Sequence, residues 1–201
     1  MSHRIRKTLT AAVLAAAIQV PASAAFAAQP RSEGHDPLAR DRINAAVSVN
    51  QTDGGSVFHL SFQIARVTGE DVAVSNVAVA LSECTSCQTV AIALQIDLIS
   101  PVPAELAATN TAVAANQDCV LCSTLAFAFQ YVVATPDPVT LTEKGKREMR
   151  RIERRLAGLS RLEGDPQELT ADVQALTADL SQVLESQLVP VSGDAGPDGA
   201  R

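Results

Sequence analysis

The sequence predicts an α+β protein in which three repeated antiparallel β-hairpins form a sheet, and an antiparallel helical hairpin follows and partly covers the apolar face of that sheet. Three observations predict it: a unit that occurs three times, period-2 hydrophobic alternation within each unit, and a change to helical spacing after Thr142. The chain has 201 residues, 47% of them hydrophobic, and a net charge of −6. These values exclude a wholly disordered chain and argue against a nucleic-acid binder.

The first 27 residues have the pattern of a secretory signal peptide. A basic start (Arg4, Arg6, Lys7) precedes an apolar run of about a dozen residues and small residues up to Ala27. The run is shorter than the roughly 20 residues of a membrane span. We therefore expect a secreted or extracellular protein, with the cell envelope as one location, and no transmembrane span after cleavage. Residues 28–41 are expected to form a flexible segment.

A threefold repeat fills residues 42–138. Each unit starts with a similar strand and continues into a second strand with a Gln at an equivalent place. The first strands are NAAVSVNQ from Asn44, NVAVALSE from Asn76 and NTAVAANQ from Asn110, and the second strands carry Gln63, Gln95 and Gln130. Alternation across a short turn such as Asp53-Gly54-Gly55 predicts a hairpin in each unit.

The two faces of the second strands differ. One face carries large apolar side chains, and the other carries mostly Ala, Ser, Thr and Gln, which we expect to form a thinly covered surface rather than a second core. Short apolar runs also fit buried helices, which is the alternative. The β-branched content favours strands.

Two CxxC pairs occupy the same turn of the second and third units. They are Cys84 with Cys87 and Cys119 with Cys122, whereas the first unit has Thr52 and Gly55 at these places. Because an exported chain enters an oxidising compartment, we expect structural disulfides. Bridges within each pair would fix the turns, and bridges between the pairs would join the two units; the sequence leaves the connectivity open.

The same four cysteines have the number and spacing of a Cys₄ zinc site, which is the first alternative, with zinc as its cofactor. The second alternative is a thiol-disulfide exchange protein. Its reactive thiolate needs a basic neighbour or a helix N-terminus, whereas the nearby charges are Glu83 and Asp118.

No catalytic residue is predicted. The motifs of zincins, serine hydrolases and nucleotide-binding proteins are missing from the sequence, and His59 is the one histidine of the expected folded region. A lone histidine on the polar face of a strand is typical of a surface residue. We interpret the chain as a non-enzyme.

Residues 139–189 predict the helical hairpin, and residues 190–201 predict a disordered tail. Thr142 suits the first N-cap, Asp165 and Pro166 suit the start of the second helix, and both helices carry an apolar stripe. The first stripe comprises Met149, Ile152, Leu156, Leu159 and Leu162, and the second comprises Leu169, Val173, Leu176, Leu180, Val183 and Leu184.

Basic residues gather on the first helix. Arg150, Arg151, Arg154 and Arg155 are the candidate partner-binding residues, and the partner would be an envelope or extracellular protein or an anionic polymer. The simpler interpretation is a solvated face whose cations meet nearby acids such as Glu148 and the acidic second helix.

These features together carry a family resemblance. The run from Asp53 to Phe58, the segments CTSCQTVAIALQ and CVLCSTLAFAFQYVV, and the basic helix KREMRRIERRL resemble a group of uncharacterised exported actinobacterial proteins, over residues 43 to 188. Some of these proteins are described as peptide zinc metalloproteases. The resemblance implies export and an association with a membrane peptidase system. It implies no protease residue here, since no zincin motif is present.

Overall fold

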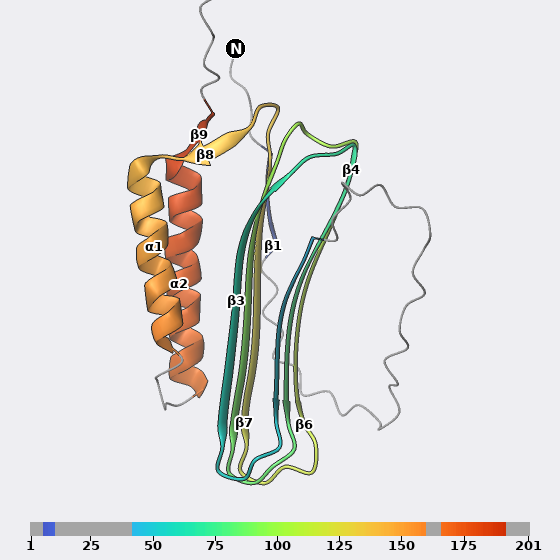
Figure 1. Ribbon diagram of the computed structural model, residues 1–201, viewed down its shortest axis with the longest axis vertical. Coiled ribbons are helices and arrows are strands. Elements are labelled where there is room, and N and C mark those ends of the chain that lie inside the picture. The colour runs from blue at the N-terminus through green and yellow to red at the C-terminus, as the bar shows by residue number, and fades with distance from the viewer. Residues whose placement is uncertain (1–5, 11–41, 160–165, 192–201) are drawn as a thin grey trace, which may run out of the picture.

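The computed structural model describes residues 6–10, 42–159 and 166–191, and in it two parallel β-sheets lie face to face with a helical hairpin on one of them (Figure 1). The sheet next to the helices has the strand order β1-β7-β5-β3, and the other has the order β2-β4-β6. The strands are β1 (Arg6–Thr10), β2 (Arg42–Asn50), β3 (Ser56–Val67), β4 (Asp71–Ser82), β5 (Gln88–Ile99), β6 (Glu105–Asn116) and β7 (Ser123–Ala134).

The repeat is confirmed, but the predicted antiparallel hairpins are wrong. The two strands of each unit lie in different sheets, and each strand pairs in parallel with its equivalent in the next unit. Asn44 pairs with Asn76 and Asn76 with Asn110. One unit is therefore one coil of a two-sheet β-solenoid, and three coils stack in register.

The physical reason is that β3, β5 and β7 need cover on both faces. The small-residue face, which we expected to be a thinly covered surface, is instead the interior between the sheets. Part of this interior is an all-alanine cluster of Ala46, Ala78, Ala80, Ala91, Ala93 and Ala128. Larger residues of both sheets form a second cluster there, with Val67, Val72, Val74, Ile99 and Val132. A hairpin sheet would leave this face in water, whereas folding each unit across two sheets buries it, as is typical of parallel sheets.

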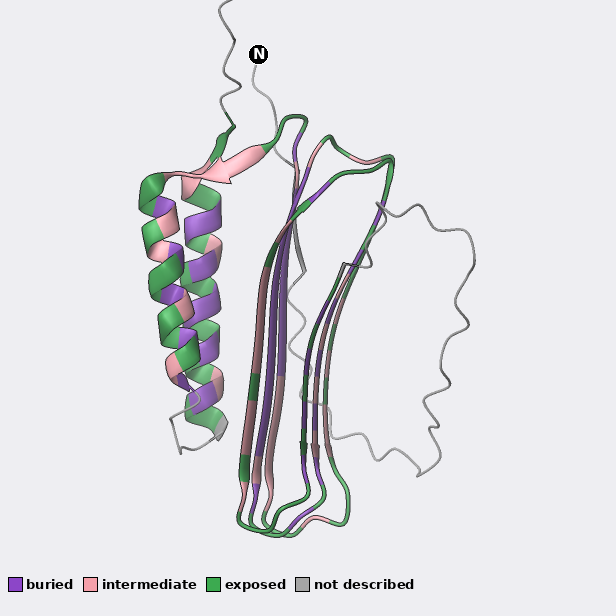
Figure 2. Ribbon diagram, viewed as in Figure 1, coloured by how far each residue is buried: buried purple, intermediate pink, exposed green. Residues whose placement is uncertain are grey.

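The large apolar side chains of the second strands face the helices, as predicted. They form the largest core with the apolar stripes of both helices, and β5 is buried along almost its whole length (Figure 2). From β5 this core takes Val90, Ile92, Leu94, Ile96 and Leu98, and from the first helix and its C-cap it takes Met149, Ile152, Leu156 and Leu159. The predicted cover of the sheet by the helical pair is confirmed.

The helical pair consists of α1 (Glu143–Gly158) and α2 (Pro166–Gln187). Thr142 is the N-cap of α1, and its hydroxyl accepts from the Gly145 amide at 3.0 Å. A short antiparallel clip of β8 (Val139–Leu141) and β9 (Leu188–Pro190) joins the two ends of the hairpin. The expected residues Leu162 and Asp165 lie outside the described residues.

At the N-terminus, β1 pairs antiparallel with β7. It falls within the expected signal peptide, whose other residues, like residues 28–41 and 192–201, lie outside the described part of the chain. Among the described helices, neither is long and apolar enough to cross a membrane.

Candidate functional site

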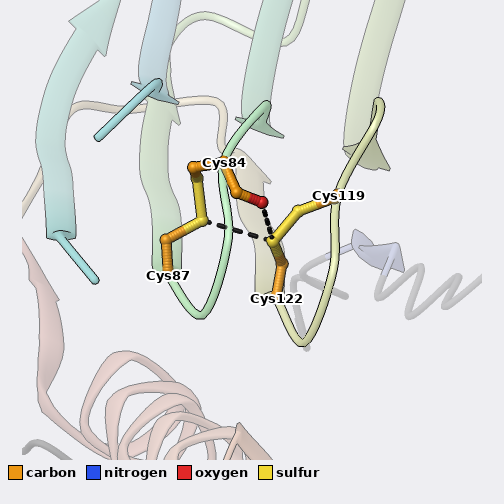
Figure 3. Close-up of side chains that lie close together, drawn as sticks. All are labelled: Cys84, Cys87, Cys119 and Cys122. Carbon is orange, nitrogen blue, oxygen red and sulfur yellow. Dashed lines mark hydrogen bonds between the residues drawn. A yellow bond between two sulfur atoms is a disulfide. The ribbon is translucent and has the colours of Figure 1, made fainter. Parts of the chain in front are cut away.

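The candidate site is the end of the solenoid where the three turns between the sheets lie on one another. The CxxC pairs occupy the turns from β4 to β5 and from β6 to β7, so stacking of the coils brings all four cysteines together (Figure 3). The four Sγ atoms lie within 4.8 Å of one another. The sequence found these residues, and the parallel register explains why they meet.

The three turns share a left-handed residue two positions before the second strand, but the third turn is one residue longer and has a further left-handed residue, Asp118, with a φ of 47°. Gly54, Ser86 and Leu121 hold equivalent places and have φ values of 66°, 55° and 57°. Neighbouring turns are hydrogen-bonded: the Gly54 amide donates to the Thr85 carbonyl at 2.8 Å, and the Ser86 amide donates to the Val120 carbonyl at 2.7 Å. The cysteine-free first turn therefore covers the second, and the second covers the third.

Each CxxC pair is at disulfide distance. The sulfurs of Cys84 and Cys87 lie 1.87 Å apart, and those of Cys119 and Cys122 lie 1.78 Å apart. Between the pairs, the sulfurs of Cys87 and Cys122 lie 3.3 Å apart (Figure 3). The sequence left the disulfide connectivity open, and the structure has the bridges within each pair.

The surroundings of the sulfurs are apolar or rich in carbonyl oxygens. Cys84 and Cys87 are 5% and 3% exposed. The Cys84 sulfur lies 3.2 Å from the Asn50 carbonyl oxygen, and the Cys122 sulfur lies 2.8 Å from that of Cys84. Carbonyl dipoles point negative charge at these sulfurs, which disfavours a thiolate and suits a neutral disulfide.

The donor set also fits zinc in number and compactness. A tetrahedral site with Zn–S bonds of about 2.3 Å places its sulfurs roughly 3.8 Å apart. All four sulfurs lie within 4.8 Å of one another, but each pair would have to be reduced and move apart from its disulfide distance to reach that spacing. Cys84, Cys87, Cys119 and Cys122 are thus the residues that would hold the ion. The carbonyl contacts count against it, because zinc needs all four sulfurs as thiolates.

The four candidate arginines are all exposed on α1. Arg155 forms an ion pair with Asp179 of α2 at 3.1 Å, so part of its charge serves the helix pair itself. At the start of α1, a hydrogen bond from Lys146 lowers the pKa of Glu143, with the charges of Lys146, Arg147 and Arg150 acting in the same direction.

His59 is exposed, with its Nδ1 2.9 Å from the Val47 carbonyl oxygen. Tyr131, which the sequence does not mark as a functional residue, is 2% exposed and lines a cavity of about 260 Å³ between β7 and α2. Burial, assisted by the charge of Glu185, raises the pKa of Tyr131. In the sequence, a tyrosine on the apolar face of a strand is typical of a core residue, and no motif spacing indicates a functional role for it.

Fold and site together define a three-coil β-solenoid with a four-sulfur end and a helical hairpin along one sheet. Comparison with models of known families, with curated proteins and with solved structures gives no match.

Proposed function

We propose that this chain is an exported, non-enzymatic scaffold whose coils are held by two disulfides and whose helical hairpin meets a partner. The observation that carries the proposal is the sulfur geometry: two bridges, each within its own turn, stacked at one end of the solenoid. Bridges there fix the turns that link the two sheets. The oxidising compartment follows from the signal-like N-terminus.

The surroundings of the four sulfurs do not favour a reactive thiolate. A thiolate at Cys84 or Cys122 would face carbonyl oxygens, which destabilise its charge. His59, from β3, is the one histidine between residues 42 and 191, and its Nδ1 is in contact with the Val47 carbonyl oxygen. These features support a structural role for the cysteines over exchange catalysis.

The redox state is tested on protein secreted from an oxidising host. Intact mass and thiol titration are measured under denaturing conditions, and bound metal is measured under native conditions. We expect the loss of four hydrogens, no free thiol and no zinc. One zinc per chain with four free thiols would establish the Cys₄ zinc module instead, which the compact sulfur set favours as second candidate.

The partner is proposed to meet the exposed basic surface of α1, and an envelope protein such as a membrane peptidase is the partner that the sequence resemblance suggests. Arg150, Arg151 and Arg154 are exposed, and none of them is in a described ion pair. The triple variant Arg150→Gln, Arg151→Gln, Arg154→Gln should lose captured envelope components. Arg155→Gln is the matched control, because its charge is already paired with Asp179. Equal capture by both variants would remove this surface from the proposal.

A further inference from the structure

We propose that the edge of β7 beneath α2 is a docking slot for one extended strand of a partner, antiparallel to β7 and with alternating apolar and basic side chains. The slot is separate from the sulfur site and from the basic surface of α1. The inference therefore holds whether the cysteines are oxidised or bind metal.

The helical pair and the repeat strands beneath it differ in width. Strands in a sheet are about 4.8 Å apart, so β3, β5 and β7 occupy about 14 Å. Two helices side by side need about 20 Å, since each is about 10 Å across. The helical pair is therefore wider than the three repeat strands by roughly one strand.

Burial shows on which side the extra width lies. On β3, Phe58, Leu60 and Phe62 are half-buried and Ile64 is 41% exposed. Of their equivalents on β7, Leu125 is likewise half-buried, whereas Phe127 and Phe129 are buried and Tyr131, the equivalent of Ile64, is 2% exposed. Part of this difference comes from β1, which lies beside β7, whereas β3 is an edge strand. The cavity that α2 forms with Tyr131 and Val133 places α2 over the β7 edge, and we take the extra width to lie there.

Beneath this overhang lies the cavity of about 260 Å³. Its walls are Tyr131 and Val133 of β7, Leu184 and Glu185 of α2, and the β8–β9 clip. The Tyr131 hydroxyl is buried and has no hydrogen-bond partner among the described residues. The acidic residues that line the cavity, Glu185 and Asp137, are exposed. This lining suits an apolar side chain next to a basic one.

The chain itself places such a segment on this edge. β1 has the sequence RKTLT and pairs antiparallel with β7, with Leu9 opposite Tyr131 and Lys7 opposite Val133. β1 belongs to the expected signal peptide. Under the proposed export, on which this step rests, cleavage would leave the outer edge of β7 unpaired, while its other edge stays paired with β5. Strand addition to such an edge gains main-chain hydrogen bonds, and the cavity selects the side chains.

A second copy of the solenoid fits this edge less well than a single strand. If the strands of a second copy continued the sheet past β7, each copy would have about 14 Å of sheet width, whereas its helical pair needs about 20 Å. The incoming α1 would therefore collide with the overhanging α2. The occupant is one strand from a partner that brings no helical pair of its own.

The test uses the full chain with Thr8→Pro and Leu9→Pro, which remove the strand-forming capacity of β1 because proline cannot donate to a ladder. The probe is a fluorescent peptide of residues 4–11, RIRKTLTA, and binding is followed by anisotropy. We expect saturable binding to the proline variant and at least tenfold weaker binding to the unmodified chain, whose own β1 already pairs with the β7 edge. Leu9→Asp is a second opening variant, in case the prolines disturb folding.

Matched controls locate the bound peptide. Glu185→Gln in the opened chain should weaken binding about threefold, whereas Asp172→Asn, an exposed acid elsewhere on α2, should not change it. N-methylation of alternate peptide amides should abolish binding for one set of positions and spare the other, because only one set faces β7. No saturable binding to either opening variant, equal binding to the unmodified chain, or indifference to N-methylation would overturn the proposal.

Discussion

The side-chain amide of Asn44 donates to the side-chain oxygen of Asn76 at 2.8 Å, although 32 positions separate them in the sequence. Asn76 in turn donates to the side-chain oxygen of Asn110 at 2.8 Å. The same amides reach across to the other sheet, where Asn76 donates to the carbonyls of Ala93 and Phe129 at 2.9 and 3.0 Å. This asparagine ladder fixes the register of the coils and ties the two sheets together.

Asn76→Ala should therefore lower the free energy of unfolding by about 3 kcal/mol, because it leaves several buried polar groups without their partner. Asn110→Ala, at the end of the ladder, should cost clearly less. Urea denaturation of both variants measures the difference. Equal costs would show that the ladder does not act through its central member.

Stability should fall in alkali because burial raises the pKa of Tyr131. A group with a raised pKa in the folded state contributes stability that is complete below its unfolded pKa of about 10 and is lost as pH rises through the folded pKa. Tyr131→Phe should remove this part of the decline, which sets in above about pH 10. Parallel pH profiles of the two proteins would argue against the buried phenol.

Two glycines of α1 should respond in opposite directions to alanine. At Gly145, a Cβ atom would lie 2.6 Å from Cβ of Gln187 and 3.2 Å from Cδ2 of Leu141, so Gly145→Ala should destabilise the protein by about 1–3 kcal/mol. At Gly158 a Cβ atom meets nothing within 4 Å, and Gly158→Ala should stabilise it by up to about 1 kcal/mol. Thermal denaturation of the two variants checks the packing of α1 against the end of α2.

The two disulfides should contribute unequally to the free energy of unfolding. Closing so short a loop contributes about 2 kcal/mol in the chain-entropy account. The double variant Cys84→Ser, Cys87→Ser should cost more than its counterpart at Cys119 and Cys122, because the first pair is the more deeply buried. Denaturation under non-reducing conditions measures both. A larger loss from the second pair would contradict the burial argument.

The sequence predicted the repeat, its strands and the helical pair, but not how the strands join. Alternation and a short turn look alike in a hairpin and in a connection between two sheets. The discriminating signal was present: Asn44, Asn76 and Asn110 recur at one place, as do Gln63, Gln95 and Gln130. Identical polar residues at interior positions favour stacking of equivalents over pairing within a unit, since each amide can then satisfy the next.

The cysteines were predictable as a group because spacing reveals them, whereas their environment was not. The carbonyl contacts at Cys84 and Cys122 come from the stacked turns and depend on the parallel register. The cavity at Tyr131 depends on the position of α2 over the sheet, which no local pattern encodes.

The pairing of the four cysteines is the most direct test of the oxidised scaffold. Both CxxC pairs lie within one tryptic fragment, so a protease that cleaves after Glu105 is used to separate them. Mapped without reduction, the secreted protein should give two unlinked peptides, each lighter than its reduced form by two hydrogens. Peptides that stay joined through sulfur, or that carry free thiols in a protein that also contains zinc, would contradict the account.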